Sequence, residues 1–184
     1  MKKTGRKVSG LGMLVYMEWI IPIIDYYWSL RKNEIVFEVI MPALVATFCT
    51  VLYWKAGKLF IALDGIANIM STAISILIGF TVMLITILLT SSGPSIDKLK
   101  DTETGRMLHN VNITLYQGLH IQFSHTLCSE VFLLLMILFY MFLSGLHVPV
   151  CVGIVILIIE IYLTLNVLLS ILRGVTNLYF SFFR

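Results

Sequence analysis

A long uncharged run constrains this chain more than any other feature. Residues 65–96 include no Asp, Glu, Lys or Arg, and most of them are aliphatic or aromatic. At a rise of 1.5 Å per residue, residues 66–90 make a helix of about 37 Å. That length crosses a hydrocarbon core of about 30 Å with some tilt. The run therefore predicts a transmembrane helix.

The whole chain has the composition of an integral membrane protein. Of its 184 residues, 59% are hydrophobic and 12% are charged, and its mean hydropathy is +0.95. An average soluble domain carries about 25% charged residues. We predict an all-α fold, an integral membrane four-helix bundle in residues 35–184 that follows a basic, amphipathic segment in residues 1–34. The expected spans are about residues 35–54, 66–90, 127–146 and 150–172.

The N-terminal segment is interpreted as an interfacial helix. Residues 11–30 are largely apolar and rich in Tyr and Trp, which favour the headgroup level of a bilayer. They also contain Glu18 and Asp25, and Pro22 predicts a break. The alternative is a fifth span, in which both carboxylates would need partners inside the membrane.

One clearly polar connection interrupts the apolar pattern. Residues 95–109 carry acidic and basic side chains, and from residue 106 the pattern is read as helical through residue 126, where the third span begins. The third and fourth spans are joined by the short turn at residues 147–149, which predicts an antiparallel pair of helices.

The distribution of basic residues predicts the orientation. With four spans, both termini and residues 95–109 lie on one side of the membrane. Only Lys55 and Lys58 lie on the other side. By the positive-inside rule, both termini are cytoplasmic, and in a bacterium this places the chain in the inner membrane. The eleven basic residues on the cytoplasmic side are Lys2, Lys3, Arg6, Lys7, Arg31, Lys32, Lys98, Lys100, Arg106, Arg173 and Arg184.

Small residues recur every fourth position in the second span. Ala67, Ser71, Ser75 and Gly79 would share one helix face, where another helix can approach closely. This pattern indicates either packing within one subunit or a contact between copies of the chain in a homo-oligomer.

Three acidic residues fall inside predicted spans. Glu160 lies near the middle of the fourth span, where an ionised carboxylate costs several kcal/mol unless it is paired, hydrated or protonated. It is interpreted either as a protonatable, pore-facing or oligomer-contact residue, or as a protonated side chain bonded to a neighbouring helix. Glu38 and Glu130 lie near the cytoplasmic ends of their spans, and we expect them to pair with Arg31, Lys32 or the basic residues at 98–106.

No motif indicates catalysis, and we expect no enzyme. The sequence lacks a phosphate-binding glycine loop, a G-x-S-x-G elbow and an H-E-x-x-H pair. Its three cysteines and four histidines have no zinc-site spacing, so no metal or other cofactor is predicted. The basic N-terminus lacks interleaved aromatic residues and fits attraction to anionic lipid better than direct nucleic-acid binding.

Two functions fit these features. In the first, the chain is a membrane sensor or anchor that presents a polar surface to a soluble cytoplasmic effector protein. The predicted partner surface comprises Lys98, Lys100, Arg106, Asn110 and Gln117. In the second, the chain is a pore-forming effector or ion channel that depolarises the cell, with Glu160 and the small-residue face of the second span in the pore.

The overall plan resembles a known family. The second span ISILIGFTVMLITILLTSS, the charged SIDKLKD segment after it and the predicted cytoplasmic termini are similar to the membrane subunit of the Kiwa anti-phage defence system. This resemblance implies a homo-tetramer that senses infection at the inner membrane and works with a soluble, DNA-associated effector. It carries over no residue-level motif. Membrane accessories of RNA-targeting CRISPR systems have a similar size and remain an alternative.

Overall fold

The computed structural model describes residues 19–108, 111–146 and 148–183. Within them, four helical segments are long and apolar enough to cross a membrane: Asn33–Lys55, Leu59–Thr90, Leu115–Leu143 and Val150–Tyr179. The first combines α2 (Lys32–Ile35), the π-helix η2 (Val36–Ile40) and α3 (Met41–Lys55), and the others are α4 (Leu59–Thr90), α6 (Leu115–Leu143) and α7 (Val150–Phe183). The predicted four-helix membrane bundle is confirmed.

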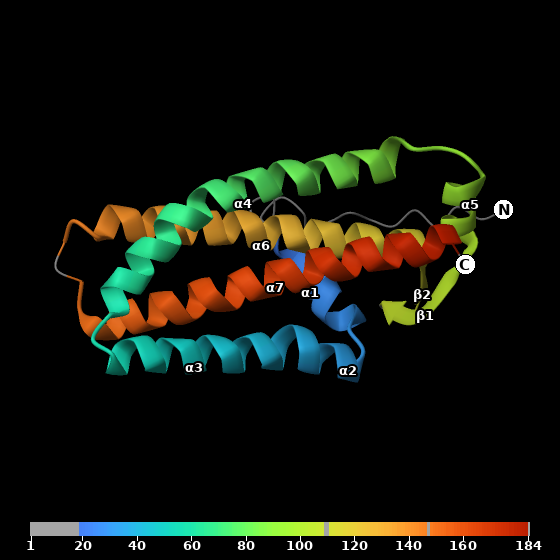
Figure 1. Ribbon diagram of the computed structural model, residues 1–184. Helices are drawn as coiled ribbons and strands as arrows, with labels where there is room; N and C mark the ends of the chain where they lie inside the picture. The colour runs from blue at the N-terminus through green and yellow to red at the C-terminus, as the bar shows by residue number, and fades with distance from the viewer. Residues whose placement is uncertain (1–18, 109–110, 147, 184) are drawn as a thin grey trace, which may run out of the picture.

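The spans lie side by side in the order α4, α6, α7 and α3 (Figure 1). Antiparallel neighbours therefore bring together the start of α2, the start of α6 and the end of α7. The short elements α5 (Pro94–Asp101), β1 (Glu103–Leu108) and β2 (Val111–Thr114) lie at this same end of the bundle. We call it the ribbon end, and we call the other end, with the α3–α4 turn, the opposite end.

The described part of the N-terminal segment forms one short helix, α1 (Ile20–Ser29). Its ten residues span about 15 Å, too little to cross a bilayer, and the helix packs against α6. Pro22 does not break it. Pro22 lies in the first turn, where its missing N–H would have no helical partner in any case. The predicted segment at residues 11–18 lies outside the described residues.

The predicted helix at residues 106–114 is wrong, because the described residues of this stretch belong to two antiparallel strands, β1 and β2. Side chains along β1 alternate between exposed and half-buried, which is the period of a strand and not of a helix. The register shifts between Glu103 and Arg106. Gly105 lies in this interval, and its φ of 65° is the left-handed conformation that glycine adopts without strain. We call β1 and β2 together the β-ribbon.

The true start of α6 has a local signal in the sequence. The Thr114 side chain accepts a hydrogen bond from the Gln117 N–H (3.3 Å), and the Gln117 side chain accepts one from the Thr114 N–H (3.0 Å). This reciprocal pair is a capping box, which satisfies two backbone donors at a helix start. The T-x-x-Q pattern at residue 114 therefore marks the boundary between ribbon and helix.

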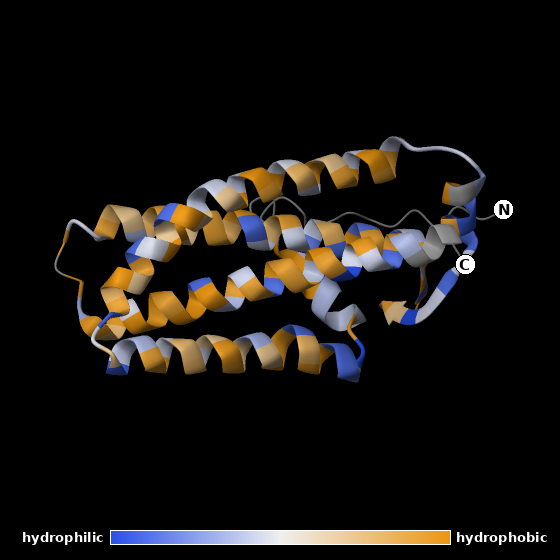
Figure 2. Cartoon of the chain, viewed as in Figure 1, coloured by the Kyte–Doolittle hydropathy of each residue, from blue (hydrophilic) through white to orange (hydrophobic). Residues whose placement is uncertain are grey.

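The core lies between α4, α6 and α7. Leu63, Ile74, Leu133, Ile137 and Leu157 are all almost completely buried there. Between 17% and 33% of the most apolar window of each span is buried within the chain, so most of every span faces outward. Figure 2 shows that most residues along the spans are hydrophobic, and many of the large ones are exposed. Such a surface is compatible with lipid and not with water.

Candidate functional site

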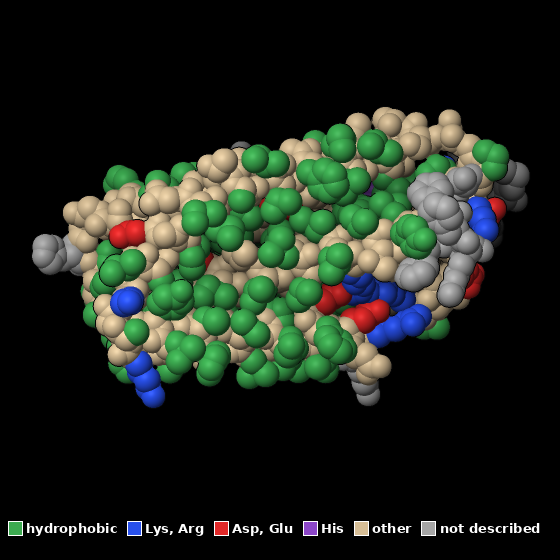
Figure 3. All heavy atoms as spheres, viewed as in Figure 1, with side chains coloured by type: hydrophobic (Ala, Val, Ile, Leu, Met, Phe, Trp, Pro, Cys, Tyr) green, Lys and Arg blue, Asp and Glu red, His purple; other side chains and the backbone are tan. Residues whose placement is uncertain are grey.

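A network of buried and half-buried charges lies at the ribbon end, and its acidic members come from α2 and η2. Glu34 and Glu38 are four residues apart and so lie on one helix face. Glu34 Oε2 accepts a hydrogen bond from the Arg31 backbone N–H at the helix start (2.9 Å). On the face shown in Figure 3, charged side chains gather beside the start of α2, and hydrophobic side chains are spread over the middle of the bundle.

Pro42 explains the unusual local geometry around Glu38. Proline has no N–H, so the Glu38 carbonyl lacks the donor that residue 42 would supply in a regular α-helix. The chain adopts π-helical bonding over Val36–Ile40, where the Met41 N–H donates to the Val36 carbonyl. The Asn166 side chain on α7 donates to the Glu38 carbonyl instead (2.9 Å). A helix defect in one span is thus satisfied by a polar side chain of another.

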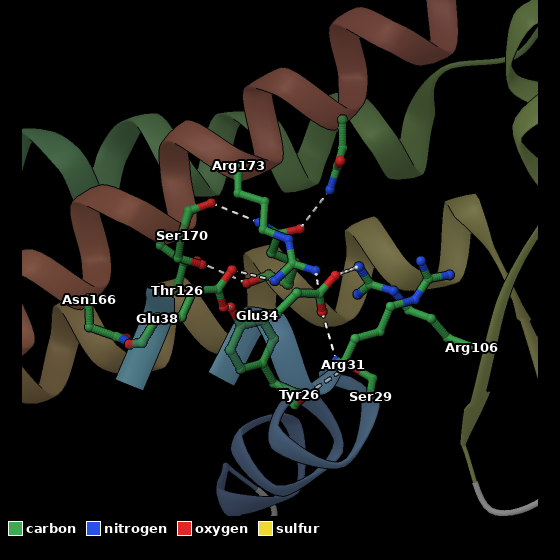
Figure 4. A network of polar contacts seen from close by, with 12 residues as sticks. Tyr26, Ser29, Arg31, Glu34, Glu38, Arg106, Thr126, Asn166, Ser170 and Arg173 are labelled. Atoms are coloured by element: carbon green, nitrogen blue, oxygen red, sulfur yellow. Dashed lines mark hydrogen bonds and ion pairs between the residues drawn. The ribbon is translucent and has the colours of Figure 1, made fainter. Parts of the chain in front are cut away.

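Arg173 on α7 is the central cation of the network. Its Nη1 group donates to Glu38 Oε1, and its Nη2 atom lies 2.8 Å from Glu34 Oε2 (Figure 4). Arg106 from β1 pairs with the second oxygen of Glu34 at 2.7 Å. The side chains of Glu38 and Arg173 are only 7% and 15% exposed, so water screens this pair weakly.

A second basic residue ties the β-ribbon to the start of α2. Arg31 Nη2 donates to the Thr104 carbonyl on β1 (2.8 Å). Burial lowers the pKa of Arg106, as does the nearby charge of Arg173, while Glu34 opposes this shift. Arg106 remains a cation because the ordinary pKa of arginine lies above 12. The ribbon is therefore held by two arginines, one through a carboxylate and one through the backbone.

Tyr26 links α1 to the same network. Its hydroxyl donates to Glu38 Oε2, and its ring stacks on His125 of α6 with centroids 3.9 Å apart. Burial raises the pKa of Tyr26 above its ordinary value of about 10, and the negative charge of Glu38 raises it further. The phenol thus stays neutral and acts as a donor to the carboxylate.

Uncharged polar side chains extend the network between α6 and α7. Thr126 Oγ1 and Ser170 Oγ lie 2.7 Å apart, and Gln122 donates to the Ser170 carbonyl (2.8 Å). Gly174 permits this close approach, because a Cβ atom added there would lie 2.6 Å from the Phe123 ring. The network therefore joins α1, α2, α6, α7 and the β-ribbon at one point.

The predicted intramembrane acids have different surroundings. Glu38 is ion-paired, as expected, but its partner is Arg173 and not the basic residues proposed from the sequence. The expected ion pair of Glu130 is wrong: this buried side chain accepts a hydrogen bond from Thr81 on α4 (2.8 Å), and no salt bridge to it is found in the described part of the chain.

The sequence does contain one signal for the charge network. Glu34 and Glu38 are two glutamates spaced i, i+4 at the start of a span, and this spacing could have indicated that they act together.

Glu160 is enclosed within one chain. The residue is 0% exposed, and neither of its carboxyl oxygens has a hydrogen-bond partner among the described residues. It therefore faces the interior of its own bundle. In this arrangement Glu160 does not reach the outer surface that another copy of the chain would contact.

The four small residues of α4 do not form a single free face. Ala67 is buried in the core, Ser71 is half-buried, and Ser75 and Gly79 are exposed. At about 100° per residue, each step of four turns the helix by about 40°, so the stripe winds away from the core. The Ser75 hydroxyl donates to the Ser71 carbonyl of its own helix.

Only part of the predicted partner surface is free to bind. Lys98, Lys100 and Gln117 are exposed, although the Lys100 ammonium lies 5.4 Å from the centre of the Tyr116 ring. Arg106 is instead half-buried and ion-paired with Glu34. Asn110 lies outside the described residues.

In the described part of the chain, no three His, Cys, Asp or Glu side chains come together as a metal site would require. Comparison with protein-family models, with curated proteins and with solved structures gives no match.

Proposed function

We propose that this multi-pass membrane protein is an inner-membrane sensor and anchor whose ribbon end lies in the cytoplasm and recruits a soluble effector protein. The orientation is supported by the eleven basic residues that the sequence assigns to the side of the termini and of residues 95–109, against Lys55 and Lys58 on the other side. The anti-phage setting, the tetramer and a DNA-associated partner rest on the resemblance in plan to the Kiwa membrane subunit alone.

The observation that carries the proposal is the attachment of the β-ribbon to the spans. Arg106 of β1 shares Glu34 with Arg173 of α7, and Arg31 holds the Thr104 carbonyl. A displacement of α7 against α2 in the membrane would therefore be passed directly to the ribbon. A sensor needs such a mechanical connection between its spans and its partner surface.

The exposed surface near the ribbon is suited to a protein partner. Met107 and Val111 on the β-ribbon are each 67% exposed, and Lys98 and Lys100 project from the neighbouring α5. Exposed apolar side chains bordered by charges are typical of protein interfaces. Nothing in this surface resembles a catalytic arrangement, so recruitment is the activity that we assign to it.

A pull-down from the native host tests this proposal. Tagged protein is extracted in mild detergent, and co-purified soluble proteins are quantified by mass spectrometry. The double variant Lys98→Glu/Lys100→Glu should lose the partner, since both charges in the interface are reversed. Lys58→Glu, at the opposite end, is the matched control and should keep it. Equal recovery of the partner with the double variant and the control would refute the assigned surface.

The alternative function is a pore that depolarises the cell. The burial of Glu160 within one chain favours a path through a single bundle over a path along an oligomer axis. Single-channel recording in planar bilayers tests it. Pore formation predicts a conductance that Glu160→Gln changes, and a protein that is silent at all voltages would exclude it.

A further inference from the structure

The interior of the bundle holds an acidic side chain without a partner. Glu160 is 0% exposed, and both of its oxygens lack a hydrogen bond within the described part of the chain. It lies ten residues from the start of α7, or about 15 Å along the helix, so it is close to the middle of a bilayer of about 30 Å. Buried polar groups are nearly always hydrogen-bonded, so a buried carboxyl without a bond is an exception that needs an explanation.

The charges around Glu160 do not compensate an ionised form. Before Lys55, α3 carries no Asp, Glu, His, Lys or Arg, and the one charged residue of α4 is Asp64. From α6, the ionisable groups nearest in depth are Glu130 and Tyr140. Arg173 follows thirteen residues later on α7, about 20 Å away along the helix. With no cation beside it, the carboxyl is much less costly to bury as the neutral acid.

A line of polar groups connects Glu160 to the opposite end. A surface pocket of about 330 Å³ opens there, lined by Phe60, Asp64, Tyr140 and Ser144 among others. The Tyr140 hydroxyl donates to Asp64 Oδ1 at 2.7 Å. Tyr140 packs in the same buried cluster as Ile156 and Leu157, which lie one turn before Glu160 on α7. Two ionisable groups, Asp64 and Tyr140, thus lie between open solvent and the part of α7 that carries the buried acid.

We propose that Glu160 is a proton-binding site that exchanges with the compartment at the opposite end through Asp64 and Tyr140. For uptake, a hydronium ion in the pocket gives its proton to Asp64 and becomes water. The Tyr140 hydroxyl then passes a hydrogen to the Glu160 carboxylate through a bridging water molecule and regains one from Asp64. The net change is the loss of one hydronium ion and the conversion of one carboxylate to a carboxylic acid.

This site is independent of the recruitment proposed above. It lies in the middle and at the opposite end of the bundle, whereas the partner surface lies at the ribbon end. It requires no second copy of the chain and no pore through the protein, because the polar line is proposed only between the pocket and Glu160. A test on purified protein without any partner therefore separates the two ideas.

Infrared spectroscopy on the purified, lipid-reconstituted chain tests the site. The C=O stretching band of a protonated carboxylic acid is recorded at neutral pH, and its shift after transfer to heavy water gives the exchange rate. Glu160→Gln should remove one such band, while Glu103→Gln, on the exposed side of the β-ribbon, should leave the spectrum unchanged. Retention of the full band in Glu160→Gln overturns the assignment of the proton.

The path through Asp64 and Tyr140 is tested in variants that keep Glu160. The test therefore does not depend on whether Glu160→Gln folds. Tyr140→Phe removes the hydroxyl and keeps the ring, and Asp64→Asn removes the outer acid. Both should slow the heavy-water shift of the Glu160 band several-fold, and Tyr53→Phe on α3 should not. An unchanged exchange rate in Tyr140→Phe overturns the proposed path.

Discussion

Removing Arg173 tests the buried network most directly. Arg173→Met keeps much of the volume of the side chain but leaves the Glu38 carboxylate, which is only 7% exposed, without a cation. Breaking a buried ion pair in this way costs about 3–5 kcal/mol. The Tyr26 hydroxyl still donates to Glu38, so we expect a loss near 3 kcal/mol. Glu34 contributes little to this loss, because it retains Arg106 and is 22% exposed.

A second variant distinguishes charge pairing from packing. Glu38→Leu alone leaves Arg173 paired only with Glu34, whereas Arg173→Met/Glu38→Leu removes both charges together. The loss of unfolding free energy in the double variant should be smaller than the sum of the two single losses by about 2 kcal/mol or more. Coupling between contacting residues is typically about 0.5–3 kcal/mol. The free energy of unfolding is measured by titrating the protein in mild detergent micelles with sodium dodecyl sulfate. Additive losses would refute the argument that an isolated buried charge dominates.

Three further predictions concern other contacts of the bundle. Gly174→Ala should destabilise the fold by about 1–3 kcal/mol in the same titration, because its new methyl group overlaps the buried Phe123 ring at 2.6 Å; Gly145→Ala, where a Cβ atom meets nothing within 4 Å, is the control. Thr81→Val should cost about 1–3 kcal/mol by depriving Glu130 of its donor, and an unchanged unfolding midpoint would contradict the bond seen at 2.8 Å. Burial and Glu38 raise the pKa of Tyr26 in the folded protein above its ordinary value of about 10. The neutral Tyr26 hydroxyl therefore contributes its full stabilisation below pH 10, and this contribution should be lost as the pH rises above that value. Tyr26→Phe should show a smaller loss of stability in alkali, measured by circular dichroism, and an identical loss would contradict this reasoning.

The β-ribbon shows why the sequence predicts a helix at residues 106–114 where the structure has strands. The sequence around Gly105 has charges at spacings that fit a helix face as well as a strand, and so periodicity alone does not decide between them. The deciding contacts come from distant parts of the chain, since Arg31 binds the Thr104 carbonyl and Glu34 binds Arg106. The capping box at Thr114 was the one local sign that the helix starts later.

The candidate site was predictable only in part. An acidic residue at a span start and a basic residue at a span end each suggested an interfacial position, but no spacing rule connects Glu38 with Arg173, which are 135 residues apart. Likewise, the sequence shows Asn166 only as a polar residue within a span. Its hydrogen bond to the Glu38 carbonyl, which Pro42 leaves without a helical donor, depends on the packing of α7 against η2. Each pairing depends on which helices are neighbours.

What the sequence determined by itself was the number and approximate position of the spans, because long apolar segments are stable only in a bilayer and must be helical there. It also predicts that the basic residues concentrate on one side of the membrane. Tertiary structure decided the rest. The order α4, α6, α7, α3 closes one bundle around Glu160 and brings Glu34, Arg106 and Arg173 together. Apolar helices have no strong preference for one another in lipid, so small residues and polar partners, met only in the folded bundle, fix which helices pack together.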